Sequence, residues 1–302
     1  MSDFLSIFRP EFLLHNALWG SIAVGLFCPL IGVYFYLRRL VLLGMALPQI
    51  SSAGIAFVFF LQGLGITWSL HAGESNDKFL ALFGSILFTL AAIFLLAFLE
   101  RRREGSVDSQ IGAAYALAFA VSLLFVSQNA KGRSELLDML NGEIVSLNSH
   151  DLNLLLLSYG ILAVCLFLFN RQFLLVSFDR DSAVVMGKNT LVWDSLLYVL
   201  MGFSISMGVL IVGPMLTFAF LIIPPLAMRR FCRRMRTFFI GSAVVGGLSG
   251  LIGFYLSYHW DWPLAPTDIV VASAFLSLGY LVKKAQLTFA RTNGHSSGHS
   301  SL

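Results

Sequence analysis

Two side chains with ligand atoms lie four residues apart in an apolar segment, residues 40–64. Met45 carries a thioether and Gln49 a neutral amide carbonyl, and a spacing of four residues puts both on one face of a helix. If the segment crosses a membrane, its glycines and prolines are tolerated where neighbouring helices or a cavity satisfy the freed backbone groups. The segment is therefore either a kinked, tightly packed helix or a helix that lines a pathway. The pathway alternative singles out Met45, Pro48, Gln49 and Ser52.

A polar stretch at residues 178–187 is the second candidate. Asp179 and Asp181 stand near its start, and Gly187 stands at its end. Acidic residues suit the N-terminus of a helix and glycine suits the position just past its C-terminus, so the pattern predicts a short helix. That helix either lies parallel to a membrane surface or docks a soluble partner, and the spacing alone favours the first alternative.

The other ionisable residues form no recognisable catalytic or metal site. No close pair of His, Asp or Glu has the spacing of a metal site, and the chain lacks H-E-x-x-H, G-x-S-x-G and an intramembrane carboxylate pair. An enzyme is therefore the least favoured class. We interpret the following as solvated loop residues on one side of the membrane: His71, Glu74, Asp77, Glu135, Asp138, Glu143, His150, Asp151, His259, Asp261 and Asp268.

The composition indicates the kind of secondary structure that must position these candidate residues. Hydrophobic residues make up 57% of the 302 residues and charged residues 12%, whereas a soluble globular chain carries roughly a quarter charged residues. The chain is therefore an all-α integral membrane protein. Its basic residues stand at the ends of apolar runs, where they act as topology anchors rather than as a nucleic-acid site. Cys28, Cys165 and Cys232 show no paired spacing and are interpreted as apolar packing residues.

Nine apolar runs are long enough to suggest membrane-spanning helices. If the N-terminus is outside, sixteen of the twenty Lys and Arg residues fall in cytoplasmic connections, and the positive-inside rule is satisfied. We therefore predict nine spans, N-out and C-in, with no cleaved signal peptide. Residues 1–290 form the transmembrane domain and 291–302, with His295 and His299, a disordered cytoplasmic tail. The predicted spans are 13–37, 40–64, 79–99, 107–127, 152–170, 192–211, 213–228, 237–257 and 265–283.

The order and spacing of several short motifs resemble the membrane permeases of the ABC-3 family, bacterial ABC importers for zinc, manganese and iron. The resemblance covers nearly the whole chain. It is carried by Leu37-Arg38-Arg39-Leu40, Gly54-Ile55-Ala56, Asp108-x-x-Ile111-Gly112, Asn141-Gly142-Glu143-Ile144, Asp179-x-x-x-Ala183-x-x-x-Gly187, Leu221-Ile222-Ile223-Pro224 and Ser257-Tyr258 with Asp261-Trp262-Pro263.

The resemblance implies a permease of the bacterial cytoplasmic (inner) membrane that imports a divalent metal ion by alternating access. It implies a homodimer, with cytoplasmic ABC ATPase subunits docked on the 179–187 loop and a periplasmic or lipid-anchored substrate-binding protein outside. Such a chain binds no cofactor of its own, because ATP is bound by the partner subunit. The coupling residues that it implies are Asp179, Asp181, Ala183 and Gly187.

The second span departs from the family pattern. The family has an Asp and a His four residues apart, a pair that can coordinate a divalent cation. Met45 and Gln49 stand at these positions, so neither ligand is charged, and the helix break is expected at Pro48. The sequence therefore leaves three alternatives open: import of a divalent metal through a different site, import of a metal chelate or non-metal solute by the same machinery, and a secondary carrier without an ATPase.

Overall fold

The computed structural model describes residues 14–64, 74–102, 107–128, 147–178, 180–232 and 234–296. Every regular element in these ranges is a helix, as the composition predicted. The helices are α2 (His15–Leu37), α3 (Val41–Gly63), α4 (Glu74–Arg102), α5 (Val107–Ser127), α7 (Ser149–Leu168), α8 (Asn170–Phe178), α9 (Arg180–Val185), α10 (Thr190–Val212), α11 (Pro214–Met228), α12 (Met235–Trp260) and α13 (Leu264–Ser296).

Each predicted span appears as a helix, and eight of these helices are long and apolar enough to cross a membrane. The remaining one, α11, has 15 residues. At 1.5 Å per residue it measures about 22 Å, which is less than the roughly 30 Å of a bilayer core. The all-helical membrane architecture is therefore confirmed, whereas the count of nine spans and the N-out orientation stay predictions.

The boundary between α10 and α11 lies at Gly213, within the Val212-Gly213-Pro214 division that the sequence indicated. Gly213 has φ of 82°, a conformation that glycine adopts without steric cost. Pro214 then occupies the first turn of α11, where its missing N–H breaks no helical hydrogen bond. The break expected at Pro48 was wrong, because α3 continues through that residue. Helix α11 likewise continues through Pro224 and Pro225.

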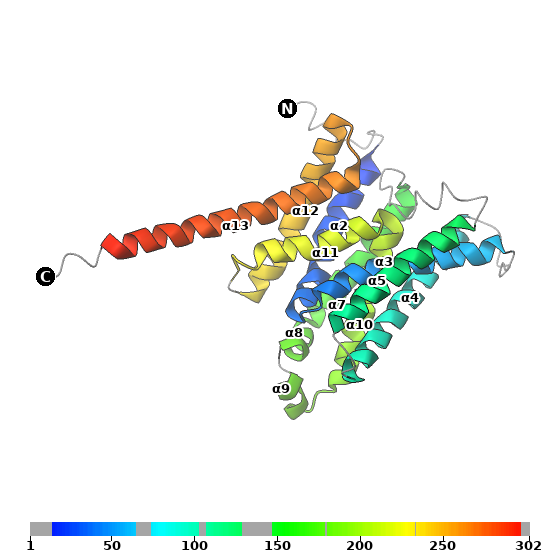
Figure 1. Cartoon of the computed structure of the whole chain (residues 1–302), viewed down its shortest axis with the longest axis horizontal. Coiled ribbons are helices and arrows are strands. Elements are labelled where there is room, and N and C mark those ends of the chain that lie inside the picture. Colours follow the sequence, from blue (N-terminus) through cyan, green and yellow to red (C-terminus); the bar gives the residue numbers. More distant parts are fainter. Residues whose placement is uncertain are drawn as a thin grey trace.

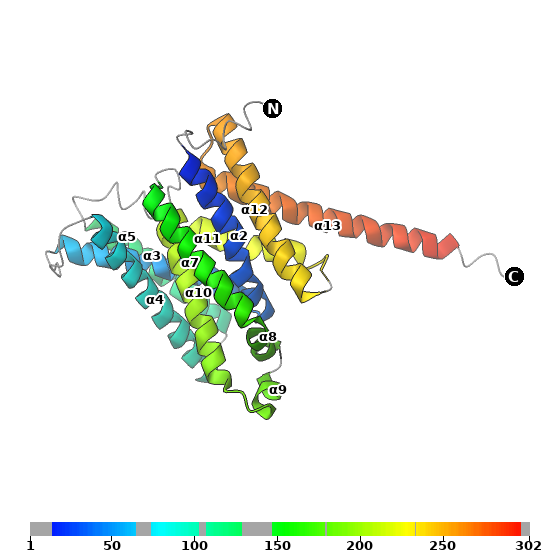
Figure 2. The same ribbon diagram turned by 180° about the vertical axis from the view of Figure 1, so that it is seen from behind.

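The most extensive contact between two helices joins α2 and α12, which lie side by side in Figures 1 and 2. A Cβ on Gly25 would collide with the backbone of Gly246, and one on Gly246 would collide with the backbone of Gly25. Gly250 faces the Ser21 carbonyl, and Gly253 faces the Asp268 side chain. We call Gly25, Gly246 and Gly250 the glycine seam, because their lack of side chains lets the backbones of α2 and α12 touch.

A second group of helices consists of α3, α4 and α5, with α3 packed against both of the others. Helix α10 contacts α3 and α4 and also reaches α2 and α7, so it connects the two groups. Helices α8 and α9 lie at the lower end of the bundle in Figures 1 and 2, opposite the junction of α12 and α13. This is the end that the sequence assigns to the cytoplasm.

Helix α13 runs from the bundle toward the C-terminus and extends well beyond its neighbours (Figure 1). It is helical to Ser296, so residues 291–296 of the tail that the sequence interpreted as disordered are helical. Residues 297–302 lie outside the described residues, and the division of the chain at residue 290 stays a prediction.

Candidate functional site

The four candidate pathway residues divide between two faces of α3. Met45 is 39% exposed and Gln49 is half-buried on the same face. Pro48 and Ser52 are buried on the face that packs against the rest of the protein. The structure therefore places Met45 and Gln49 together, as the spacing predicted, and separates them from Pro48 and Ser52.

Gln49 links α3 to α5. Its amide nitrogen donates to the Ser122 hydroxyl oxygen at 3.4 Å, and that hydroxyl donates in turn to the Phe119 carbonyl oxygen at 2.8 Å. An amide and a hydroxyl can exchange such partners without leaving a charge unpaired, because both groups are neutral. The face that carries Met45 and Gln49 is thus polar, uncharged and partly open.

A chain of buried hydroxyls crosses from α3 through α4 to α10. The Ser51 and Ser85 hydroxyls are hydrogen-bonded to each other. The Thr89 hydroxyl donates to the Ser85 carbonyl oxygen at 2.7 Å, and the Ser206 hydroxyl donates to the Thr89 hydroxyl oxygen at 3.3 Å. All four side chains are fully buried. Sequence reasoning selected Ser52 and missed this chain, because single hydroxyls in apolar helices carry no spacing signal that identifies their partners.

A smaller polar cluster lies between α2, α7 and α10. The Cys28 thiol contacts the Tyr159 hydroxyl at 3.2 Å, and that hydroxyl donates to the Ser204 carbonyl oxygen at 3.2 Å. Cys28 is fully buried, as expected for a packing residue, and it also has a polar partner. Among the described residues there is no group of three or more His, Cys, Asp or Glu that could hold a metal ion.

The interpretation of Asp268 as a solvated loop residue was wrong. The side chain is fully buried near the start of α13, and the Ser21 hydroxyl of α2 donates to one carboxyl oxygen at 2.5 Å. The other carboxyl oxygen faces Gly253. Since a carboxyl group inside a membrane is costly unless it is paired, Ser21 and Asp268 form a polar lock beside the glycine seam.

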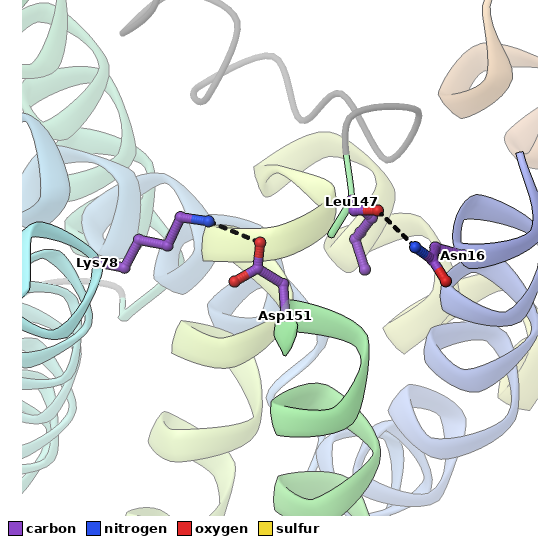
Figure 3. A network of polar contacts seen from close by, with 4 residues as sticks. All are labelled: Asn16, Lys78, Leu147 and Asp151. Atoms are coloured by element: carbon purple, nitrogen blue, oxygen red, sulfur yellow. Dashed lines mark hydrogen bonds and ion pairs between the residues drawn. The ribbon is translucent and has the colours of Figure 1, made fainter. Parts of the chain in front are cut away.

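Asp151 is also paired, rather than simply solvated. Its carboxylate binds the Lys78 ammonium at 2.6 Å, and the aspartate side chain is 17% exposed. Nearby, the Asn16 side chain donates to the Leu147 carbonyl oxygen at 3.1 Å. Figure 3 shows the two contacts flanking the start of α7, with Lys78 reaching it from α4 and Asn16 belonging to α2. These contacts hold three helices together at the end that is predicted to face outward.

The predicted short helix is present as α9, and its C-terminus is capped as the sequence indicated. Gly187 has φ of 71°, and the Lys188 amide donates to the Ala183 carbonyl oxygen at 3.0 Å, which is the six-residue closure of a Schellman motif. Ala183 is fully buried, whereas Val185 is 88% exposed. Asp179 and the Asp181 side chain lie outside the described residues, so the structure leaves their coupling role as a prediction.

Arg38 joins the end of α2 to the helices around α9. Its guanidinium forms an ion pair with the Asp194 carboxylate of α10 at 2.7 Å, and its Nε donates to the Ser177 hydroxyl of α8 at 3.0 Å. The guanidinium carbon also lies 5.2 Å from the centre of the Tyr198 ring. The sequence identified Arg38 as a topology anchor and as part of a family motif, but it gave no partner for the side chain. Its contacts connect the start of α3, through the α2–α3 turn, to the helix that precedes α9.

Comparisons with known proteins place this arrangement among transport permeases. Residues 11–283 match the family described as the ABC 3 transport family. The chain is 24% identical over 296 residues to the manganese import system permease protein ScaB of Streptococcus parasanguinis, with 98% of each chain covered. It is also 24% identical over 261 residues to the "Probable iron transport system membrane protein" of Haemophilus influenzae, with 86% of each chain covered.

The fold resembles that of a solved structure titled "PsaBC from Streptococcus pneumoniae in complex with Fab". The TM-score is 0.79 at 22% sequence identity, and the alignment covers 92% of this chain and 95% of that chain. Because the family match spans nearly the whole sequence and the helices agree with that fold, the chain is a multi-pass membrane permease that belongs to the ABC 3 transport family.

Proposed function

We propose that this chain is the permease subunit of an ABC importer for a divalent metal ion in the bacterial cytoplasmic membrane. The names of the relatives, a manganese permease and an iron transport protein, support a metal substrate. The proposal is carried by the exposure of α9, a short glycine-capped helix at the end of the bundle. The apolar side chains of Val185, its last residue, and of Met186, which follows it, are 88% and 66% exposed. Exposed apolar groups on a rigid element are typical of a docking surface for a partner.

In this proposal ATPase subunits dock on residues 179–187 and hydrolyse ATP, and the permease itself is not an enzyme. Arg38 supports a mechanical connection, because it ties the α2–α3 turn to α8 and α10. A shift of α9 caused by the ATPase would pull on α8 and, through Arg38, on the start of α3. ATP binding would then favour one of two conformations, inward-facing or outward-facing, as alternating access requires.

The partly exposed face of α3 supports a homodimer with a shared pathway. A second copy would cover Met45 and Gln49 and enclose them, and a substrate-binding protein would deliver the ion from outside. A thioether and an amide carbonyl are weak ligands for hard divalent ions. Weak ligands suit passage rather than storage, since an ion must leave each contact as readily as it arrives.

The second candidate function is import of a metal chelate or a non-metal solute by the same machinery. The uncharged Met45 and Gln49 favour it, because a chelate carries its own ligands and needs no carboxylate from the protein. An ATPase-independent secondary carrier is less favoured, because α9 would then have no partner. Co-purification of an ATPase subunit with this chain would exclude the secondary carrier.

The coupling proposal is tested by Gly187→Pro in the complete transporter, reconstituted in liposomes with its ATPase. Proline fixes φ near −65°, whereas Gly187 has φ of 71°, so the cap of α9 is lost. We expect membrane insertion to be retained and ATP-driven uptake of Mn²⁺ to fall about tenfold or more, the range of an effect on a docking element. Gly187→Asn is the matched control, because asparagine tolerates the left-handed conformation. Normal ATP-driven uptake by Gly187→Pro would refute the coupling role.

The two substrate classes are separated in the same liposomes. Uptake of free ⁵⁴Mn²⁺ is compared with uptake of the same isotope bound to a membrane-impermeant chelator, each with and without ATP. Faster ATP-dependent uptake of the free ion supports the metal importer. Uptake of the chelate alone would favour the second candidate.

A further inference from the structure

A basic pocket lies where α2, α8 and α11 end and α12 begins. Its volume is about 390 Å³. The guanidinium-bearing side chains of Arg39, Arg229 and Arg234 line it together with an apolar wall that includes Leu37, Phe178 and Phe238. The pocket therefore combines positive charge with an apolar surface, a combination that the permease function described above does not use.

The described residues that line the pocket include three arginines and no acidic residue. Residues 229–236 include five arginines and no acidic residue. Helix α12 begins at Met235 with no acidic residue in its first turn and no side-chain cap at Arg234, so the positive end of its dipole faces more positive charge, which is unfavourable. The two ion pairs within the described side chains belong to Arg38 and Lys78. An anion in the pocket would relieve this repulsion.

Aromatic contacts hold one of the arginines in place. The Arg229 guanidinium carbon lies 4.8 Å from the centre of the Tyr36 ring, and that ring packs edge-on against Phe238 with centroids 6.0 Å apart. A guanidinium that is stacked on a ring loses little entropy when it binds, and its planar donors match the oxygens of a phosphate. The pocket is thus partly preorganised for a phosphate group.

The position of the pocket selects the source of that phosphate. Leu37 is the last residue of one candidate span and Met235 is the first residue of another, so the pocket lies at the boundary of the apolar layer. Phospholipid phosphates lie at this depth, with their acyl chains directed toward the apolar layer. Basic pockets between helix ends on the cytoplasmic side bind acidic lipid headgroups. A free phosphate would gain nothing from the apolar wall.

We propose that the pocket formed by Arg39, Arg229 and Arg234 binds the phosphate of an anionic phospholipid. The lipid bridges the ends of α2 and α11 and the start of α12, and its acyl chains lie along the apolar wall. Phe178 is the last residue of α8 and directly precedes the 179–187 loop, so the bound lipid also touches the base of that loop. This proposal holds whichever solute the permease carries.

The test uses the purified full chain in detergent and measures lipid binding by native mass spectrometry. Short-chain phosphatidylglycerol, short-chain phosphatidylcholine and inorganic phosphate are added in separate titrations. The pocket variant is R229Q/R234Q and the matched control is R230Q/R236Q, which removes the same charge from the same segment at positions outside the pocket lining. We expect one phosphatidylglycerol to bind at least tenfold tighter than phosphatidylcholine. The pocket variant should weaken it about thirtyfold, since it removes two basic residues that each contribute on the order of 1 kcal/mol near an anionic lipid, and the control should weaken it less than threefold.

Three outcomes would overturn the proposal. Equal losses in the two variants would mean that only the total charge matters. Equal affinities for phosphatidylglycerol and phosphatidylcholine would mean that the pocket does not distinguish lipids by headgroup charge. Binding of inorganic phosphate as tight as that of phosphatidylglycerol would assign the pocket to a free anion. Thermal unfolding of both variants checks that they fold, and Arg39→Gln, on a different segment, provides a second pocket variant whose lipid affinity must also fall.

Discussion

The glycine seam and the α3–α4–α5 group both contain close glycine contacts, Gly25 against Gly246 and Gly54 against Gly84, and they differ in the polar groups that accompany this packing. In lipid there is little hydrophobic drive between helices, so association depends on close packing and on interhelical hydrogen bonds. The seam uses backbone contact at Gly25 and Gly246, which leaves no room for sliding. The second group adds neutral hydrogen bonds such as those of Ser51 and Gln49, which join α3 to α4 and to α5. A buried carboxyl group, Asp268, lies beside the seam, whereas the hydrogen bonds of Ser51 and Gln49 join neutral groups.

The largest expected effect is that of Gly246→Ala. The new Cβ would collide with the Gly25 carbonyl and the Pro29 ring, so α2 and α12 must separate, at a cost of about 3 kcal/mol, the upper end for overpacking. Thermal unfolding of the purified chain measures the loss. Gly247→Ala is the control on the next residue, since its Cβ would meet only Leu26 atoms at 3.7 Å. Equal stability of the two variants would contradict the tight seam.

Removal of the polar lock beside the seam should have the next largest effect. Ser21→Ala takes away the hydroxyl that donates to Asp268 and leaves a buried carboxyl group without that partner, at a cost of about 1–2 kcal/mol. Ser249→Ala is matched in burial, but its hydroxyl donates only to the Val245 carbonyl of its own helix. It should change the unfolding temperature little. If both substitutions have the same effect, the lock adds nothing to stability.

Loss of the hydrogen bond that joins α10 to the second region should lower the free energy of unfolding less. Ser206→Ala breaks the link from α10 to Thr89, and interhelical hydrogen bonds in membranes contribute about 0.6 kcal/mol on average. Ser158→Ala serves as the comparison, because the Ser158 hydroxyl donates to Leu154 within α7. A loss for Ser206→Ala as large as that for Gly246→Ala would contradict the smaller contribution expected of this hydrogen bond.

The smallest effect on stability is expected for Gln49→Ala. The side chain is half-buried and its hydrogen bond to Ser122 is long, at 3.4 Å, so the free energy of unfolding should change by about 0.5 kcal/mol or less. Under the proposed function the same change should lower Mn²⁺ uptake in liposomes at least threefold, an expected order for one weak ligand. Leu42→Ala, also on α3 and 45% exposed, is the control. Unchanged uptake would remove Gln49 from the pathway.

Local patterns in the sequence were sufficient to predict the helices and several of the residues at which they end. The apolar runs predicted every span-sized helix because length and hydropathy act within one segment. The boundary at Gly213 and the cap at Gly187 followed from the backbone freedom of glycine, with φ of 82° and 71°. The order of the short motifs was sufficient to identify the family. The break expected at Pro48 was wrong, because α3 continues through that proline.

The candidate site was predicted only in part, because its contacts join residues far apart in the chain. The spacing of Met45 and Gln49 placed them on one face, but nothing local could pair Gln49 with Ser122 or Arg38 with Asp194. Asp268 was assigned to solvent because it stands near a loop, and its Ser21 partner lies 247 residues away. The sequence by itself determined a helical membrane permease and the candidate face of α3. Only the tertiary structure decided which helix backbones touch and which polar groups are paired, since burial and partners depend on how the helices assemble.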